Sequence, residues 1–409
     1  MEWKEVRLGD IVSIKSGLAY KGAFIGKGEN ILLGMGCVSF KDKFLFSGAR
    51  PYEADCEDKY CVGPGDIVLA TRQQSDNLPI LAMPAIIPSS LKAKKIIYGT
   101  NLYKVENHSE VTNDFLFWQL KMPDYIDYIS SVKTGSVVRM VTKKNIEDYV
   151  FRCPPKEVRD RISKLLWGLD RKIELNNKIN ADLEEMAQAI FKNWFVDFEL
   201  FKDSKFVDSE LGMIPEGWKV GRLGDFCKCL LGGTPSRSKE EYWNGDVNWI
   251  NSGEINKFRI LEASEKITEL GLSKSATKLL PKKTTVLAIT GATLGQVSLL
   301  EIDTCANQSV IGVLENTEIP YEYIYPFIKD RIEMLIQHQT GGAQQHINKD
   351  NVESLIFLLP AKNVLENYIS LVGPMYKRIE SQCFENLYLS SLRDTLLPRL
   401  MSGELEVPE

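Results

Sequence analysis

Apolar residues after Pro155 recur alternately every four and three positions, a spacing of 3.5 residues that is typical of a helix packed along a coiled-coil seam. Two asparagines occupy the central slots of this series. Polar residues lower the stability of a seam but fix its register, so the pattern favours specific pairing with one other helix. The seam positions are Ile162, Leu166, Leu169, Ile173, Asn176, Asn180, Leu183, Ala187 and Ile190.

The residues before Pro155 follow a different pattern, in which short apolar runs are separated by glycine and proline. The runs 31–33 and 66–70 predict short strands. Apolar residues at helical spacing predict one helix near 114–129 and a counterpart near 321–336. This mixture favours an α+β fold with β-rich domains.

The chain contains an internal repeat. At an offset of 215, seven of the fifteen positions from Trp3 to Gly17 carry the same residue as their counterparts. At an offset of 206, residues 134–154 match 340–360, and the match continues into the helix that follows. Between these blocks the sequences diverge. We therefore interpret the shared ends of each repeat as a common scaffold, and the different middles as two surfaces that recognise different targets. Duplication of a purely structural domain is the alternative.

Transferred by 206 residues, the seam recurs near the end of the chain, again with polar residues at the two central slots: Val372, Met375, Ile379, Gln382, Asn386, Leu389 and Leu396. Each helix packing on its own copy would place the two helices antiparallel, related by a pseudo-two-fold axis. We expect β-rich domains at 1–155 and 201–361, and helical regions at 156–200 and 362–409. Helices of roughly 35–40 residues are about 50–60 Å long, so the expected molecule is a dumbbell whose heads lie at least one DNA turn apart.

Length and charge narrow the choice of function. At 409 residues the chain exceeds what one hydrophobic core usually supports. The net charge of −5 disfavours a nucleic-acid binder, and none of the segments 1–152, 153–210, 211–362 and 363–409 is basic as a whole. Any DNA-binding surface of this chain must therefore be a local basic patch, or must be completed by a partner subunit.

The start of the chain lacks the layout of a secretion signal and no long apolar run follows, so we expect a cytoplasmic protein. The eight cysteines lack paired metal-site spacings, and the chain has only three histidines, so we expect reduced, structural cysteines and no metal.

No catalytic motif stands out in the sequence. Pro154-Pro155 lacks the context of a methyltransferase turn, and the glycines at 26–28 and 34–39 lack the spacing of nucleotide-binding loops. The acidic cluster at 55–59 is better explained as a solvated charge run than as a nuclease site. We therefore expect a non-catalytic protein that recognises DNA. A self-contained methyltransferase or nuclease is disfavoured.

Polar, glycine-containing loops are the candidate reading surfaces. Arg, Gln and Asn can contact base edges, whereas Ser, Thr and Lys suit phosphates. Each loop could equally be an ordinary exposed turn. The candidate DNA contacts are Arg72, Gln73, Gln74, Lys133, Thr134, Ser136, Arg139, Lys143, Thr234, Ser236, Arg237, Lys239, Thr340, Gln344, Gln345, His346 and Lys349.

Four stretches then resemble, in order, recurring signatures of the specificity subunits (HsdS) of type I restriction-modification systems. The resemblance covers essentially the whole chain. The stretches are AIFKNWFVDF at 189–198, GMIPEGW at 212–218, GGTPSRS at 232–238 followed by Tyr242-Trp243, and LRDTLLPRLMSGEL at 392–405.

This resemblance implies two target-recognition domains, each reading one half of an asymmetric bipartite DNA site, with the helical regions acting as a molecular ruler. It also implies two methyltransferase subunits docked mainly through the helices, and restriction–translocation subunits in the larger complex. S-adenosylmethionine, ATP and magnesium would be bound by those partners, and this chain would have no cofactor of its own.

For partner docking, the sequence favours six residues after the two helices: Trp194, Phe195, Phe198, Leu397, Arg399 and Leu400. The aromatic residues among them could instead close the helix end against their own domain. A different class of function also remains open, namely a coiled-coil adaptor whose heads bind proteins rather than DNA.

Overall fold

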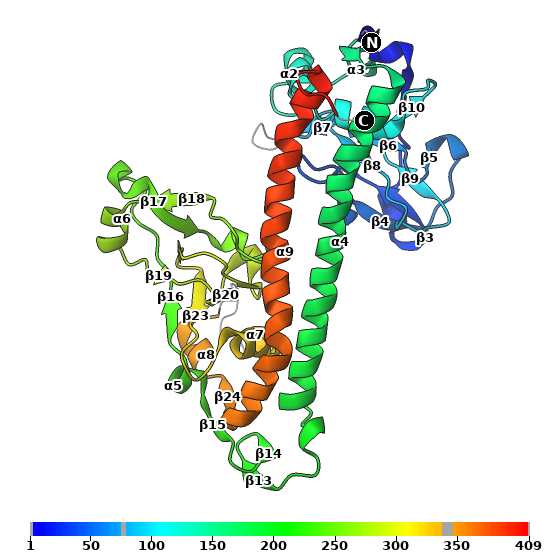
Figure 1. The fold of residues 1–409 in the computed structure, drawn as a ribbon. Helices are drawn as coiled ribbons and strands as arrows, with labels where there is room; N and C mark the ends of the chain where they lie inside the picture. The colour runs from blue at the N-terminus through cyan, green and yellow to red at the C-terminus, as the bar shows by residue number, and fades with distance from the viewer. Residues whose placement is uncertain (1–2, 75–78, 338–346, 408–409) are drawn as a thin grey trace. The chain divides into compact units, whose positions relative to one another are not determined.

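The computed structural model describes residues 3–74, 79–337 and 347–407. The chain divides into two compact units (Figure 1). The first unit comprises Met1–Lys172 together with Leu389–Glu409, and the second comprises Ile173–Tyr388. Two long helices, α4 (Lys156–Phe195) and α9 (Lys362–Ser402), contribute residues to both units.

Two four-stranded sheets form most of the first head. The first sheet has the order β2 (Val12–Ser16), β10 (Leu102–Asn107), β6 (Ile67–Ala70), β8 (Pro84–Ile86), and all its pairs are antiparallel. The second has the order β4 (Ala49–Tyr52), β3 (Ile25–Leu33), β9 (Ile96–Tyr98), β5 (Cys61–Val62), and its β3–β9 pair is parallel. Two further pairs are β1 (Lys4–Arg7) with β12 (Val150–Cys153), and β7 (Arg72–Gln73) with β11 (Arg139–Met140).

The second head repeats this order of strands. Its first sheet is β16 (Cys229–Leu231), β23 (Val310–Val313), β20 (Thr285–Ala288), β21 (Val297–Leu299), again antiparallel throughout. Its second is β18 (Glu265–Ile267), β17 (Trp243–Ile250), β22 (Thr304–Ala306), β19 (Leu279–Leu280), with the parallel pair at the matching place. The remaining elements are β13 (Phe206–Ser209) with β14 (Gly212–Pro215), β15 (Lys219–Arg222) with β24 (Ile356–Leu359), α5 (Leu223–Phe226), α6 (Glu269–Ser273) and α8 (Lys349–Glu353).

The repeat thus extends through the middle of each head, where the sequences differ most. To form a strand there, a segment needs only apolar or β-branched residues at its buried positions, and many different sequences meet this requirement. All four residues of β6 and all four of β20 are buried. The middles therefore differ in sequence and share a fold.

The two blocks of sequence identity meet in the structure. The antiparallel pair β1–β12 aligns Lys4 with Cys153, and the pair β15–β24 aligns their counterparts Lys219 and Leu359. Close packing explains a shared glycine, because a Cβ added at Gly17 would lie 2.2 Å from a backbone oxygen. The same overlap, also 2.2 Å, would occur at Gly232. These identities maintain the scaffold.

The helix expected at 114–129 is divided in two. The structure has α1 (Asn113–Gln119) and α2 (Pro123–Val132), because Pro123 cannot continue a helix and instead begins a new one. The counterpart in the second unit is one helix, α7 (Tyr321–Gln337), despite an internal proline at Pro326. A short helix, α3 (Lys143–Glu147), precedes β12.

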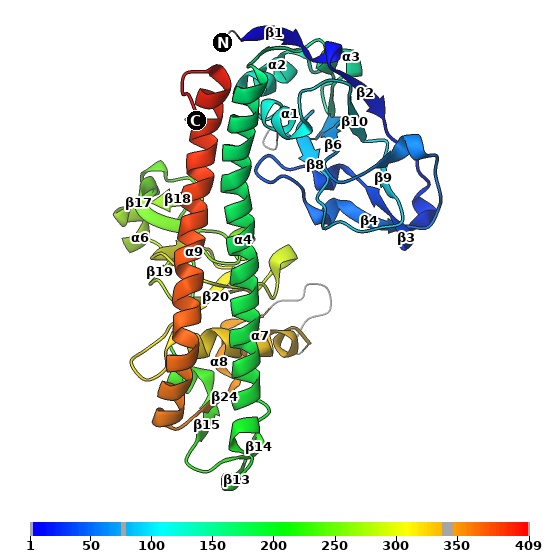
Figure 2. The ribbon, with the colours of Figure 1, turned by 45° about the vertical axis from the view of Figure 1, so that its right-hand side comes forward.

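The two long helices lie side by side and antiparallel, as Figures 1 and 2 both show. All sixteen expected seam positions are buried or half-buried. The polar slots pair with one another: Asn176 Nδ2 donates to Asn386 Oδ1 at 2.8 Å, and Gln382 Nε2 donates to Asn176 Oδ1 at 3.0 Å. Asn176 and Gln382 are counterparts in the repeat. The expected α+β architecture with a paired antiparallel coiled coil is therefore confirmed.

Replacing Asn176 by leucine is expected to lower the free energy of unfolding by about 1–3 kcal/mol, because Gln382 is 1% exposed and would lose its acceptor. Replacing Asn176 and Gln382 together by leucine removes both members of the fully buried pair. The other two acceptors of Asn176, Glu385 and Asn386, are half-buried and can reach solvent, so the double variant should recover most of this loss. Urea unfolding of the single and double variants tests the pair. A double variant as unstable as the single one would show that these hydrogen bonds do not determine the cost.

Candidate nucleic-acid interface

Two of the candidate reading loops of the first head meet in one ribbon. Strand β7 pairs antiparallel with β11, which aligns Arg139 with Gln73 and Met140 with Arg72. A further bridge joins Thr134 to Met140, with both backbone hydrogen bonds at 2.9 Å. Loops separated by about sixty residues in the sequence thus form a single surface feature.

The turn of this ribbon, residues 134–140, is tightly held. Gly135 has a φ of +92°, and a Cβ at this position would lie 2.2 Å from the carbonyl oxygen of Val138. The guanidinium of Arg139 donates to the carbonyl oxygens of Gly135 and Ser136, the latter at 3.0 Å. Thr134 and Ser136 are exposed, whereas Lys133 and Arg139 are half-buried.

One candidate in this region has a structural role instead. Gln73 is 5% exposed, and its Oε1 accepts a hydrogen bond from the backbone N–H of Leu81 at 3.1 Å. Its side chain is therefore turned into the head and is not offered to a ligand. Its neighbours Arg72 and Gln74 are exposed.

Lys143 is exposed at the start of α3, and Thr142 caps that helix by accepting from the N–H of Asn145 at 3.1 Å. In the second head, Asn348 caps α8 in the same way, accepting from Asn351 at 2.8 Å. There Lys349 forms an ion pair with Glu353 at 2.9 Å. In both caps the side-chain oxygen of the recurring asparagine accepts a hydrogen bond from the capping residue: Asn145 from Thr142 Oγ1 at 2.6 Å, and Asn351 from the N–H of Asn348 at 2.9 Å.

The candidate loop at 234–239 in the second head is rich in internal contacts. Thr234 donates to Gln308 at 2.6 Å, Ser236 bonds with Ser238 at 2.9 Å, and Lys239 donates to Tyr242 at 3.0 Å. Arg237 is bound by both carboxylate oxygens of Glu265, and its guanidinium lies 3.6 Å from the ring centre of Trp243. The side chain of Arg237 still keeps 55% of its surface exposed.

Four candidates of the second head, Thr340, Gln344, Gln345 and His346, lie outside the described residues. Directly after them, the N–H of Ile347 bonds to the carbonyl oxygen of Ile289 at 3.0 Å. The loop 290–295 follows β20 in the second head, as β7 follows β6 in the first. Sequence reasoning missed this loop. The sequence contains a signal for this loop: Val-Leu-Ala at 68–70, shortly before β7, recurs at 286–288, shortly before the loop 290–295.

The docking residues expected after the helices are mostly internal. Phe195 is 4% exposed and packs against Trp218, Tyr323 and Tyr368. Leu397 and Leu400 are 7% and 1% exposed in the core of the first unit. Phe195 thus closes the helix end against its own unit, as the alternative interpretation held. The docking assignment is corrected for Phe195, Leu397 and Leu400, because the chain itself covers these side chains.

The remaining three docking candidates are only partly covered. Trp194 and Phe198 are half-buried, with Trp194 packed on Phe201 and Tyr368 and with Phe198 packed on Trp218. Arg399 keeps 48% of its side chain exposed and pairs with Glu404 at 2.9 Å. None of the three stands out as a free apolar surface.

In the second unit, a buried charge cluster attaches α4 to the head. Arg259 Nη2 lies 2.6 Å from Glu184 Oε2, and Glu184 Oε1 accepts from Tyr325 at 2.6 Å and from Lys329 at 2.7 Å. Burial raises the pKa of Glu184, but the charges of Arg259 and Lys329 outweigh it, so the pKa lies below its ordinary value. Glu184 is therefore ionised, and both of its carboxylate oxygens accept hydrogen bonds within the cluster.

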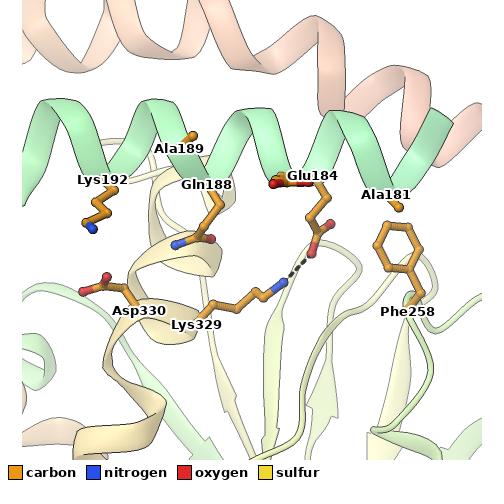
Figure 3. Close-up of a pocket in the computed structure, with 9 residues that line it drawn as sticks. Ala181, Glu184, Gln188, Ala189, Lys192, Phe258, Lys329 and Asp330 are labelled. Carbon is orange, nitrogen blue, oxygen red and sulfur yellow. Dashed lines mark hydrogen bonds and ion pairs between the residues drawn. The ribbon is translucent and has the colours of Figure 1, made fainter. Parts of the chain in front are cut away.

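Beside this cluster lies a hollow of about 510 Å³ between α4, α7 and Phe258 (Figure 3). Its walls carry both signs of charge, including Lys192, Lys329 and Asp330, and Lys329 points to Glu184 across it. Since the central charges neutralise one another, the hollow is a by-product of the attachment and has no features of a substrate site.

The first unit has a smaller cluster of the same kind. The buried carboxylate of Asp170 lies 2.5 Å from Arg393 Nη1 and 3.2 Å from Lys43 Nζ. Lys43 comes from a loop of the head, and Asp170 and Arg393 come from the two long helices. Each unit thus attaches its head to its part of the helix pair through a buried carboxylate.

Residues 3–74, 79–337 and 347–407 contain no cluster of three His, Cys, Asp or Glu side chains that could hold a metal ion. Within the same ranges, no helix is long and apolar enough to cross a membrane.

The fold and these loops define a class of protein, namely a duplicated β-rich reader with a paired helical spacer and different polar loops in its two heads. The sequence matches the family described as type I restriction modification DNA specificity domain over residues 1–185 and again over 215–367. The chain therefore belongs to this family of type I specificity subunits.

Individual relatives agree with this assignment. The chain is 24% identical to the type I restriction enzyme HindI specificity subunit of Haemophilus influenzae over 470 aligned positions, covering 99% of this chain and 100% of that protein. It is 27% identical to the MjaIX specificity subunit of Methanocaldococcus jannaschii over 306 positions, covering 73% and 70%. The crystal structure of a type I system S subunit from M. genitalium has the same fold, with a TM-score of 0.56, 13% identity and coverage of 100% and 97%.

Proposed function

We propose that each head of this specificity subunit reads one half of an asymmetric bipartite DNA site, in the cytoplasm of a prokaryote. The observation that carries the proposal is the strand order that the two heads share, combined with different loops at the same place. In the first head β6 is followed by β7, which pairs with β11, and in the second head β20 is followed by the loop 290–295. A common scaffold with different side chains suits two unrelated half-sites.

The proposal gives this chain no catalytic step. Two methyltransferase subunits would bind S-adenosylmethionine and methylate adenine, and restriction subunits would bind ATP and magnesium. The helices would act as the ruler that sets the distance between the half-sites. The full name of the HindI relative, a specificity subunit of a restriction enzyme, supports this division of labour.

For partner docking we propose a different set of residues from the buried ones. Exposed apolar side chains on α4 and α9 offer the kind of surface that a helical partner covers. Within the described residues of the two helices these are Leu175, Met186, Leu371, Phe384, Leu387 and Tyr388, of which Tyr388 is 66% exposed. The seam residues between them are already used for pairing.

The function is tested by expressing the chain with candidate methyltransferase subunits and mapping methylated adenines across the host genome. We expect one bipartite motif with a fixed spacer. Exchanging residues 1–155 for another head should change one half of the motif and leave the other half and the spacer unchanged. A contiguous motif, or no methylation with a competent partner, would contradict the proposal.

The adaptor alternative predicts a different result in a binding measurement. If the heads bind proteins, the affinity of the assembled complex for DNA should be weak and show no sequence preference. If they bind DNA, log affinity should fall linearly and steeply with log salt, because phosphate contacts release counterions.

A further inference from the structure

The turn of the ribbon in the first head presents an apolar side chain to solvent. Val137 is 81% exposed, the highest value among the large apolar side chains that are exposed in the described residues. Val138 and Met140 in the same turn are 37% and 42% exposed. A valine so exposed at the tip of a tight turn does not help to pack the head, which makes it a candidate for contact with a ligand.

The turn is also rigid enough to place that side chain. Arg139 binds two carbonyl oxygens across it, the Thr134–Met140 bridge closes its base, and the backbone at Gly135 leaves no room for a Cβ. A side chain on such a turn loses little conformational entropy when it binds. The turn is therefore ordered before any ligand arrives.

The charge around the turn is opposite to that of the whole chain. Residues 131–144 contain four basic residues, Lys133, Arg139, Lys143 and Lys144, and no acidic residue, in a chain of net charge −5. Lys143 and Lys144 are exposed, as is Arg72 on the paired strand. This is the local basic patch that a polyanion requires, and it favours nucleic acid over a protein surface as the occupant.

We propose that Val137 enters the major groove and contacts the C5-methyl group of a thymine in the half-site read by the first head. The major groove admits a two-stranded β-ribbon, and the thymine methyl is the one apolar group on its floor. The cations on both sides of the turn hold the phosphates that border the groove. This inference rests on the proposed function and names a residue that determines specificity.

The test uses the full chain assembled with its methyltransferase subunits, and DNA carrying the motif found by methylation mapping. Each thymine of the first half-site, on either strand, is replaced in turn by deoxyuridine, which differs only by the absent methyl. Wild-type complex should lose about fourfold in affinity at one position, the factor expected for one buried methyl-sized group. The variant Val137→Ser should bind thymine and deoxyuridine equally at that position.

Val150→Ser is the matched control, because Val150 is also exposed (50%) in the first head but lies on β12 outside the ribbon. It should keep the wild-type preference for thymine. The inference is overturned if wild type binds its motif but distinguishes no thymine from deoxyuridine, if Val137→Ser keeps the preference, or if the half-site contains no A·T pair. Each of these results leaves the proposed function standing. If the wild-type complex shows no sequence-specific DNA binding at all, the proposed function itself is refuted.

Discussion

Replacing Arg259 by alanine is expected to lower the free energy of unfolding by about 3–5 kcal/mol, since breaking a buried ion pair leaves an uncompensated charge. The side chain of Arg259 is 1% exposed, and that of its partner Glu184 is 9% exposed. The variant would leave Glu184 with Lys329 and Tyr325. It would also remove one of the two cations beside the buried carboxylate of Glu301, which lies 3.8 Å from Arg259 Nε and forms an ion pair with Lys283. Chemical denaturation of the purified chain measures the loss.

Lys205→Ala serves as the control for this variant. Lys205 belongs to the same unit and pairs with Glu216 at 2.7 Å, but both side chains are more than half exposed. Such surface pairs contribute about 0–1 kcal/mol because solvent screens them. Equal losses in the two variants would show that burial of the Arg259 cluster does not determine its contribution.

Phe195→Ala is expected to cost about 3–5 kcal/mol of stability, the usual range for removing a buried phenylalanine. Its ring packs on five other aromatic rings of the second unit. Tyr388→Ala, on the exposed face of α9, should change stability by less than about 0.5 kcal/mol. Thermal unfolding of both variants separates a core residue from a surface residue.

The same two variants test the docking proposal. Tyr388→Ala should weaken assembly with the methyltransferase subunits while the chain remains folded, because it removes exposed apolar surface. Phe195→Ala should assemble normally at temperatures where it is still folded. The reverse pattern, with assembly lost in folded Phe195→Ala and kept in Tyr388→Ala, would restore the original assignment.

The helix pair could be predicted almost completely from the sequence. Heptad spacing is a local property, and the polar slots at Asn176 and Gln382 identify their own partners because the repeat relates them. The strand pair β1–β12 could not be predicted in this way, although both of its strands lie in matching blocks of the repeat. A repeat shows which residues recur and does not show which strands pair.

The direction in which a side chain points could not be predicted in the same way. Gln73 and Gln74 are adjacent and chemically identical, yet one is buried against Leu81 and the other is exposed. Which of them faces solvent depends on the β7–β11 pairing, a contact between residues far apart in the chain. The apolar ends of the long helices posed the same difficulty, because composition does not show which surface covers Phe195 or Leu400.

The first unit combines two segments that are far apart in the sequence, and this affects the order in which the two heads fold. Leu397, Leu400 and Met401 pack in the same core as Leu8 and Val12, so the head synthesised first lacks part of its interior until residues 397–401 have been made. The second unit, Ile173–Tyr388, is continuous and is complete before that. Because domains fold as units during synthesis, the second head is expected to fold first and the first head last, when the final helix closes it.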